Sequence, residues 1–204
     1  DSGSFGGGIL FSAETAAAGR ELFTSTGAVG SFQLVSNFAA GAASSSPEIQ
    51  LVSGLVAFVS ATTAAAGREP WMSVDIGVTF TEVALGDLNP GTNDSDPSDF
   101  VVAGGTAFFV AEDPTHGREL WKTGGSAATT ALVEDIFPGA ASSGIRAPVA
   151  FDGKLFFGAC EPATGCELWT SDGTSGGTQL FKDLFPGVRS GDPRFFKVVG
   201  DDLY

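Results

Sequence analysis

The sequence is poor in the residues on which most catalytic and metal sites depend. Its 204 residues include one His, one Met, one Tyr and two Cys. With His116 as the only histidine, neither a zinc site nor a serine hydrolase has a convincing set of partners. Gly173-Thr174-Ser175-Gly176-Gly177 matches the G-x-S-x-G nucleophile motif, but that motif needs a strand-to-helix turn, and here we expect a hairpin turn. The sequence therefore predicts no enzymatic activity and no cofactor, apart from the calcium considered below.

Long apolar runs and basic residues are also scarce. No run of about 18 apolar residues occurs, so we expect no helix that spans a bilayer and no insertion into a membrane. No charged-then-apolar leader is present. The chain carries 24 acidic and 10 basic residues, for a net charge of −14. Nucleic acid is excluded as a partner because its phosphates would be repelled.

Sustained helical periodicity is missing as well, whereas glycine is abundant. The chain has 29 Gly and is 43% hydrophobic, and its short apolar runs are separated by Gly, Pro, Asp and Ser clusters. Such a pattern is typical of short strands joined by turns, not of long capped helices. The sequence therefore predicts an all-β protein.

One strand-like stretch that ends in a turn recurs along the chain. Its clearest copy is Gly165-Cys166-Glu167-Leu168-Trp169-Thr170-Ser171-Asp172-Gly173-Thr174. Imperfect copies are Gly117-Arg118-Glu119-Leu120-Trp121, Gly67-Arg68-Glu69-Pro70-Trp71 and Gly19-Arg20-Glu21-Leu22-Phe23. Their glutamates, at positions 21, 69, 119 and 167, are 48, 50 and 48 residues apart. A period of this size indicates a repeat architecture.

A second landmark keeps the same register. Asp183-Leu184-Phe185-Pro186-Gly187 matches Asp135-Ile136-Phe137-Pro138-Gly139, Asp87-Leu88-Asn89-Pro90-Gly91 and Asn37-Phe38-Ala39-Ala40-Gly41. The final Gly follows the motif aromatic by 18 residues in three copies and by 20 after Trp71. The second copy therefore carries a two-residue insertion.

Each period reads as four short strands, which is the dimension of a β-propeller blade. In the last copy we expect strands at Lys154–Cys160, Cys166–Ser171, Thr178–Leu184 and Arg194–Val199. We predict a single repeat domain over 1–204, a four-bladed propeller with four antiparallel strands per blade. The repeats are 9–54, 55–105, 106–153 and 154–202, and 203–204 start a further strand. The alternatives are a slice of a larger propeller and a linear array of blades.

The repeated aromatic and glutamate have structural and functional readings. Phe23, Trp71, Trp121 and Trp169 recur at one phase, so we expect them to fill equivalent positions in the core between blades. Stacking on sugar rings is the alternative. We expect the glutamate beside each aromatic to accept hydrogen bonds from a backbone or arginine partner, although its recurrence could suggest catalysis.

The two cysteines replace a polar pair of the other repeats. Cys160 and Cys166 stand where the third copy has Glu112 and Arg118, at positions that face each other if the segment is a hairpin. The paired substitution predicts a cross-strand disulfide and an extracellular location. The alternative is two free thiols in a reduced compartment.

The stretch from Glu167 to Thr174 resembles the ELWxxDGT repeat proteins, a family of large extracellular bacterial repeat proteins. Glu119-Leu120-Trp121-Lys122-Thr123-Gly124-Gly125-Ser126 keeps the front half of the motif but not its Asp. The first two copies depart further, with Phe23 in place of Trp and Pro70 in place of Leu. The resemblance implies propeller-like domains outside the cell and brings no catalytic residues.

The densest acidic stretch is Asn93-Asp94-Ser95-Asp96-Pro97-Ser98-Asp99. The carboxylates of Asp94, Asp96 and Asp99 could bind calcium, which prefers six to eight oxygens. The spacing of an EF-hand and its central Gly are missing, so a solvated loop is the alternative. Asn93-Asp94-Ser95 is also a sequon for N-linked glycosylation, at Asn93.

The sequence therefore predicts an extracellular structural or adhesive repeat domain. It would associate with itself or with neighbouring domains in a surface layer, appendage or filament, because the repeat has no convergent polar site. The alternative is a lectin-like propeller that binds glycan or protein through loops on one face. Asp202-Leu203-Tyr204 aligns with Lys154-Leu155-Phe156, so this strand either closes a ring or continues an array.

Overall fold

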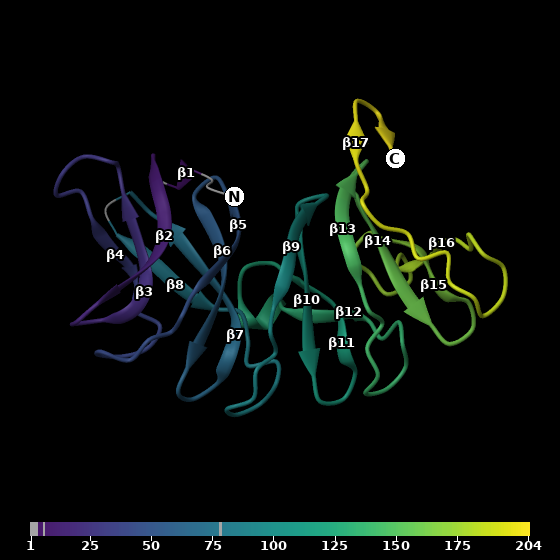
Figure 1. The fold of residues 1–204 in the computed structure, drawn as a ribbon, viewed down its shortest axis with the longest axis horizontal. Helices are drawn as coiled ribbons and strands as arrows, with labels where there is room; N and C mark the ends of the chain where they lie inside the picture. Colours follow the sequence, from purple (N-terminus) through teal and green to yellow (C-terminus); the bar gives the residue numbers. More distant parts are fainter. Residues whose placement is uncertain (1–3, 6, 78) are drawn as a thin grey trace. The chain divides into compact units, whose positions relative to one another are not determined.

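A computed structural model describes residues 4–5, 7–77 and 79–204. Within these ranges the chain forms four four-stranded antiparallel sheets and one two-stranded sheet. The only helical element described is a 3₁₀ turn, η1 (Ala127–Thr129), so none of the described elements is a helix able to cross a membrane. The all-β prediction is confirmed (Figure 1).

In each four-stranded sheet the strands pair in chain order, as a meander. Sheet 1 contains β1 (Ser4–Phe5), β2 (Gly8–Thr15), β3 (Gly19–Ser25) and β4 (Gln33–Ser36). Sheet 2 contains β5 (Glu48–Ser53), β6 (Val56–Thr63), β7 (Gly67–Asp75) and β8 (Phe80–Ala84). Sheet 3 contains β9 (Ser98–Ala103), β10 (Thr106–Asp113), β11 (Gly117–Thr123) and β12 (Ala131–Glu134). Sheet 4 contains β13 (Arg146–Phe151), β14 (Lys154–Glu161), β15 (Gly165–Ser171) and β16 (Gln179–Lys182).

The repeat boundaries predicted from the sequence begin one strand too late. In sheet 4 the first strand is β13, which pairs with β14 through Val149↔Phe156 and Phe151↔Lys154. The predicted strand at Arg194–Val199 does not join this sheet. Only its end forms β17 (Val198–Val199), which pairs with β18 (Asp202–Leu203).

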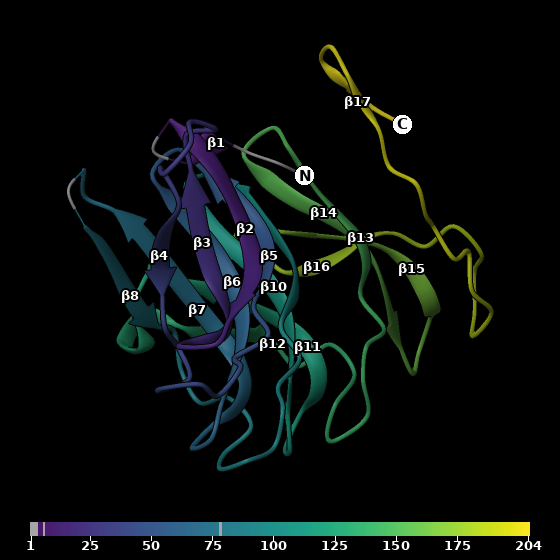
Figure 2. The same ribbon diagram turned by 60° about the vertical axis from the view of Figure 1, so that its left-hand side comes forward.

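A short turn explains this pairing. Asp152 and Gly153 connect β13 to β14 with φ angles of 48° and 71°, and two successive positive φ values are what a two-residue antiparallel hairpin requires. After β16, by contrast, the chain makes a long connection before β17, as Figure 2 shows. In sheet 4 this tight turn therefore joins the central hairpin to the strand that precedes it.

The chain divides into two compact units where one domain was predicted. Unit 1 comprises residues 1–98 with 125–128, and unit 2 comprises 99–124 with 129–204. Each unit contains two of the four-stranded sheets. The number of these sheets and their antiparallel order agree with the prediction, whereas ring closure into a propeller stays a prediction.

Each unit has one hydrophobic core between its two sheets. In unit 1, Leu10, Leu22 and Val35 of sheet 1 pack with Ala57, Val59 and Ala61 of sheet 2. In unit 2, Phe108, Leu120, Val133 and Ile136, from sheet 3 and the segment after β12, pack with Leu155, Phe157, Ala159 and Trp169 of sheet 4. Burial of apolar side chains between sheets is the main favourable term for such an architecture. One face of a sheet is thus covered by the following sheet of the same unit.

Candidate functional site

The most strongly repeated polar feature is a buried glutamate in the third strand of each sheet. Glu21, Glu69, Glu119 and Glu167 are all at most 2% exposed. A buried carboxylate is costly unless hydrogen bonds satisfy it, and here backbone amides do so. The expectation that these glutamates accept from the backbone agrees with the structure.

Each carboxylate binds two amides at fixed positions in the connection that leaves its own sheet, and Glu21 and Glu119 also bind a third, that of Ala39 and Phe137 respectively. One amide lies 17 residues after the glutamate and the other 24, or 19 and 26 in the repeat with the insertion. The N–O distances are 3.1 and 3.1 Å from Glu21 to Phe38 and Ser45, and 2.9 and 3.1 Å from Glu69 to Leu88 and Ser95. They are 3.3 and 2.9 Å from Glu119 to Ile136 and Ser143, and 2.7 and 2.5 Å from Glu167 to Leu184 and Gly191. We call this arrangement the glutamate clamp.

The two residues before each glutamate complete the clamp. Gly67 has a φ of 61°, and a Cβ built on it would lie 2.1 Å from the carbonyl oxygen of Asn93, so only glycine fits. The next amide, that of Arg68, donates to Oδ1 of Asp94 at 2.7 Å. In the other repeats a serine hydroxyl takes the role of Asp94, at Ser44, Ser142 and Ser190.

The residues proposed as calcium ligands therefore have a different setting. Asp94 accepts the Arg68 amide, and Asp96 has a left-handed backbone with a φ of 45°. Asp99 belongs to the second unit. Among the described residues no three His, Cys, Asp or Glu side chains lie close enough to hold a metal, so the calcium hypothesis finds no cluster to support it. Asn93 is exposed and its amide donates to the Pro90 carbonyl at 3.2 Å, and its glycosylation stays a prediction.

Burial changes the acidity of two clamp glutamates. Desolvation raises the pKa of Glu119 to about 7, although hydrogen bonds from Ser143 and from the Phe137 and Ile136 amides act in the opposite direction. Desolvation likewise raises the pKa of Glu69 to about 7, against the hydrogen bonds from Leu88 and Ser95. Protonation of these two clamps is therefore coupled to folding near neutral pH.

The predicted disulfide between Cys160 and Cys166 is present. The two residues lie directly opposite each other in the β14–β15 hairpin. At the same register, sheet 1 has Glu14 opposite Arg20, an ion pair of 3.3 Å, and sheet 2 has Thr62 opposite Arg68. The bond thus replaces a polar cross-strand pair, as the aligned substitutions indicated.

A guanidinium group contacts the same connection in sheets 2 and 4, but it comes from different strands. In sheet 2, Arg68 of β7 donates to the Ser46 carbonyl at 3.0 Å and pairs with Glu48 at 3.0 Å. In sheet 4 the position of Glu48 is held by Arg146 of β13, which donates to the Gly144 carbonyl at 3.1 Å. Ser46 and Gly144 are equivalent in the repeat. Cys166 thus stands where sheet 2 has Arg68. In sheet 4 the guanidinium comes instead from Arg146 on the neighbouring strand β13.

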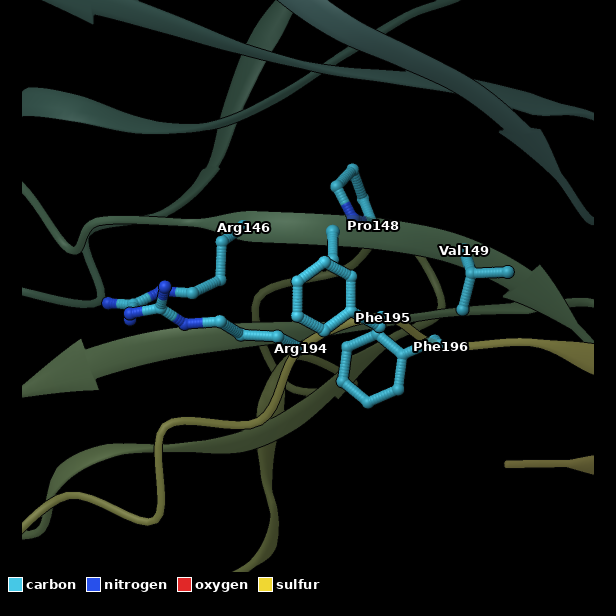
Figure 3. A pocket seen from close by; sticks show the side chains of 7 residues that line it. Arg146, Pro148, Val149, Arg194, Phe195 and Phe196 are labelled. Atoms are coloured by element: carbon cyan, nitrogen blue, oxygen red, sulfur yellow. The ribbon is translucent and has the colours of Figure 1, made fainter.

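Arg146 also lines a cavity of about 410 Å³ at the start of β13, shown in Figure 3. Its other lining residues are Ala147, Pro148, Val149, Arg194, Phe195 and Phe196. Asp192 forms ion pairs with both arginines. Phe195 is 90% exposed, so an aromatic ring and two cations meet at an open surface.

Only two of the motif aromatics lie in or against the core of a unit, whereas Trp121 and Phe23 are buried outside both core clusters, so the expectation of four equivalent core positions is not met. Trp169 belongs to the core of unit 2, and Trp71 packs against the core of unit 1, where its ring lies 5.1 Å from that of Phe38. Trp121 is buried, and its indole N–H donates to the Ala111 carbonyl at 3.2 Å. Phe23 is buried under Phe32, with ring centroids 4.4 Å apart.

The residues of the G-x-S-x-G match do not form a nucleophilic pair. The Ser175 hydroxyl donates to Glu134 in the turn before β16. The His116 ring binds Asp113 at 2.7 Å at the tip of the β10–β11 hairpin. Hydrogen bonds from His116 and Thr115 lower the pKa of Asp113 although burial would raise it, and the hydrogen bond with Asp113 raises that of His116. Ser175 thus connects its turn to β12 of sheet 3, and His116 stabilises the turn of its own hairpin.

Sequence reasoning did not identify the clamp partners. Ser45, Ser95 and Ser143 stand in serine-rich or acidic loops, where their residue types do not mark them as partners of a buried carboxylate. The available signal was their fixed distance of 24 residues, or 26 with the insertion, from the motif glutamate. In the fourth repeat this position is Gly191, which keeps the amide and lacks the hydroxyl.

The structure thus defines a class: an all-β protein in which glutamate clamps fix the connections between four-stranded antiparallel sheets. Comparison with known proteins found no family that matches the chain and no curated protein with significant similarity to it. Function must therefore be argued from the surfaces of the sheets.

Replacing Glu119 by Gln is expected to weaken the pH dependence of stability. Because the pKa of Glu119 rises from 4.5 to about 7 on folding, the folded state binds more protons than the unfolded state between these pH values. The contribution of Glu119 to stability is therefore fully present below pH 4.5 and is lost as the pH rises to about 7. The variant should lose this part of the change in unfolding free energy with pH, which is at most about 1.4 kcal/mol per pH unit. Urea unfolding at a series of pH values measures it.

The matched control is Glu82→Gln on the exposed part of β8, which should leave the slope unchanged. An identical slope in wild type and Glu119→Gln would show that Glu119 does not titrate in this window.

The positions of Cys160, Cys166 and Arg146 in sheet 4 should accept the residues that sheet 2 has at the equivalent positions. Replacing both cysteines by serine is expected to cost roughly 2 kcal/mol, the chain-entropy value for so short a loop. The triple variant Cys160→Thr, Cys166→Arg and Arg146→Glu should recover about 1 kcal/mol of this loss, because it restores the guanidinium contact seen at Arg68. Chemical unfolding of both variants tests the idea, with reduced wild type as a control. A triple variant no more stable than the serine pair would contradict it.

Proposed function

We propose that this chain is an extracellular structural domain that self-associates through an apolar face of sheet 4. The face consists of Phe156, Leu168 and Phe181 together with Leu184 just after β16, and we call it the outer face of sheet 4. It is the side of the sheet opposite to Phe157 and Trp169, which belong to the core of unit 2.

The carrying observation is a difference in burial between equivalent positions. In sheet 3 these positions are Phe108, Leu120, Val133 and Ile136, all buried in the core that sheet 4 completes. In sheet 4, Phe181 is 57% exposed and Leu184 is 49% exposed. Sheet 4 therefore has the same apolar surface as sheet 3, but a larger part of this surface is exposed. Contiguous exposed apolar surface of this kind marks interaction sites.

The end of the chain covers this face incompletely. Phe156, Leu168 and Phe181 line one side of a cavity of about 380 Å³, and Leu203 and Tyr204 contribute to its other side. Tight packing between sheets leaves few voids larger than a water molecule. The β17–β18 hairpin, seen projecting beyond sheet 4 in Figure 1, is thus not equivalent to a packed neighbouring sheet.

Other features support a structural role outside the cell. The Cys160–Cys166 disulfide is typical of proteins in oxidising compartments. The resemblance of Glu167–Thr174 to ELWxxDGT repeats also favours an extracellular array. The glutamate clamps account for the repeated acidic residues through backbone hydrogen bonds, so these residues need no catalytic role to explain their recurrence.

A second candidate function, binding of an acidic glycan, is favoured by the cavity of Figure 3. Arg194, which pairs with Asp192 but is about half exposed, and Phe195 offer a cation and an exposed ring, which suit a carboxylate and the apolar face of a sugar. Arg146 contributes less, because its guanidinium already contacts Asp192, the Gly144 carbonyl and Cys160. Self-association is the better-supported function.

Replacing Phe181 by Glu should weaken assembly of the domain. A buried, unpaired carboxylate in the contact is expected to raise the dissociation constant by about tenfold or more. Sedimentation velocity over a range of concentrations measures it, and negative-stain images of the wild type should show regular fibres or sheets. Val29→Glu is the matched control, since Val29 is fully exposed in the β3–β4 turn. A wild type that stays monomeric at every concentration would refute the proposal.

The glycan alternative predicts that Arg194→Ala weakens binding of oligosaccharides that contain uronic acid by about tenfold. Titration calorimetry with acidic and neutral oligosaccharides measures it, and Arg189→Ala serves as the control because Arg189 lies over the Phe185 ring instead. Equal binding of both oligosaccharide types, or none, would remove this candidate.

A further inference from the structure

We infer that the Cys160–Cys166 disulfide is a reactive site that exchanges with an external thiol, in which Cys166 receives the thiol and Cys160 is released. The favoured reagent is a small thiol that carries a carboxylate. This inference concerns the chemistry of one hairpin of unit 2 and does not depend on the proposed self-association. It gives the bond a function in addition to linking β14 to β15.

A cation contacts one of the two sulfur atoms. Nη2 of Arg146, on the neighbouring strand β13, donates to Sγ of Cys160 at 3.1 Å. The same guanidinium forms an ion pair with Asp192 through Nη1 and donates from Nε to the Gly144 carbonyl at 3.1 Å. Asp192 therefore occupies one nitrogen and leaves another directed at the sulfur. Because these contacts hold the guanidinium in place, a positive charge lies beside Cys160 before any reaction begins.

A cation at this position is specific to the sheet that has the disulfide. Sheets 2 and 3 have Glu48 and Ser98 at the position of Arg146. In sheet 2, Nη2 of Arg68 contacts the Ser60 hydroxyl at 2.8 Å, whereas Nη2 of Arg146 contacts a sulfur. A carboxylate at this position would repel a negatively charged sulfur, and a guanidinium attracts one. The change of charge therefore accompanies the two cysteines.

Both cysteines lie outside the core. In β14 and β15 they alternate with the buried residues Ala159 and Glu167, so their side chains share the side of sheet 4 that faces away from the core of unit 2. Each cysteine is half-buried. The bond is therefore not sealed within the hydrophobic core, and a small reagent has a route to it in the folded protein.

The chemistry of thiol–disulfide exchange makes the position of this cation important. An external thiolate attacks one sulfur of the bond and forms a mixed disulfide there, while the other sulfur leaves with the bonding electron pair as a thiolate. A better stabilised thiolate leaves faster. Because Arg146 stabilises negative charge on Cys160, attack on Cys166 is favoured. The products are a mixed disulfide at Cys166 and a free Cys160 thiolate, and the external thiol is the only co-reactant.

The surroundings of Arg146 favour an anionic thiol. Arg146 and Arg194 line the cavity of Figure 3, where their guanidinium groups lie close together because both pair with Asp192. Arg194 is about half exposed, and its remaining N–H groups suit the carboxylate of an incoming reagent. We therefore expect glutathione, a thiol with two carboxylates, to react faster than its diethyl ester.

The rate at which glutathione reduces the native protein tests the inference. Free thiols are trapped at successive times and counted in the wild type, Arg146→Gln and Arg146→Lys. The Gln variant should react about tenfold more slowly, because it loses a charge-assisted contact to the leaving sulfur, and the Lys variant should keep part of the rate. Arg189→Gln is the matched control and should react like the wild type, since Arg189 lies over the Phe185 ring.

Two further measurements test the site of attack and the reagent. Fragmentation mass spectrometry of the acid-quenched reaction should find glutathione on Cys166 and a free thiol on Cys160. Glutathione diethyl ester should react more slowly than glutathione with the wild type, and this difference should shrink in Arg194→Gln. Equal rates for the two reagents would overturn the assignment of an anionic thiol.

A purely structural disulfide gives different results. If Arg146 only stabilises the fold, its replacement loosens sheet 4, and the Gln variant is reduced as fast as the wild type or faster. If the native bond is inert, the wild type is reduced only at the rate of global unfolding, which urea unfolding kinetics measure. Glutathione found on Cys160 would place the attack on the other sulfur. Each of these results overturns the inference, and none of them bears on self-association.

Discussion

The architecture depends on one interaction, the buried carboxylate that binds backbone amides of the connection between sheets. A connection without regular structure has backbone amides with no hydrogen-bond partner in a helix or sheet. Burying such amides without a partner would cost more free energy than most packing contacts contribute. In each repeat a single glutamate accepts at least two such amides, one shortly after the fourth strand and one seven residues further along the connection. The sheets of a unit therefore stack mainly by apolar contact, because hydrogen bonds to the glutamate satisfy the amides of the chain between them.

The clamp keeps its geometry while the residues around it vary. Ser44 and Asp94 accept the same amide in different repeats, and a guanidinium reaches the same carbonyl from Arg68 or from Arg146. The disulfide belongs to this series of exchanges, as a covalent substitute for a cross-strand polar pair. What the repeats share is a set of contacts, and the residue types that provide these contacts differ from one repeat to the next.

Period, strand content, disulfide and the structural role of the glutamate were all predictable from the sequence, because each produces a local pattern. The repeat boundary was not, since Arg194–Val199 and Arg146–Phe151 are equivalent segments and only the Asp152-Gly153 turn decides which one joins β14. The carboxylates of Asp94 and Asp96 suggested calcium because the sequence does not show that Asp94 accepts a backbone amide. The partial exposure of one face of sheet 1 and one face of sheet 4 was not predictable either, because the residues of these faces match buried residues in the other repeats.

The two-residue insertion in the second repeat shows how much length the β7–β8 hairpin can absorb. Both strands are longer than their counterparts, yet Glu69 still binds Leu88 and Ser95, the equivalents of Phe38 and Ser45. The extra residues lengthen the hairpin toward its exposed end, and the chain still contacts the Glu69 carboxylate before it enters β9. This hairpin is consequently a natural position for grafting a foreign peptide, an epitope tag or a fluorophore-bearing loop, with the path of the chain downstream preserved.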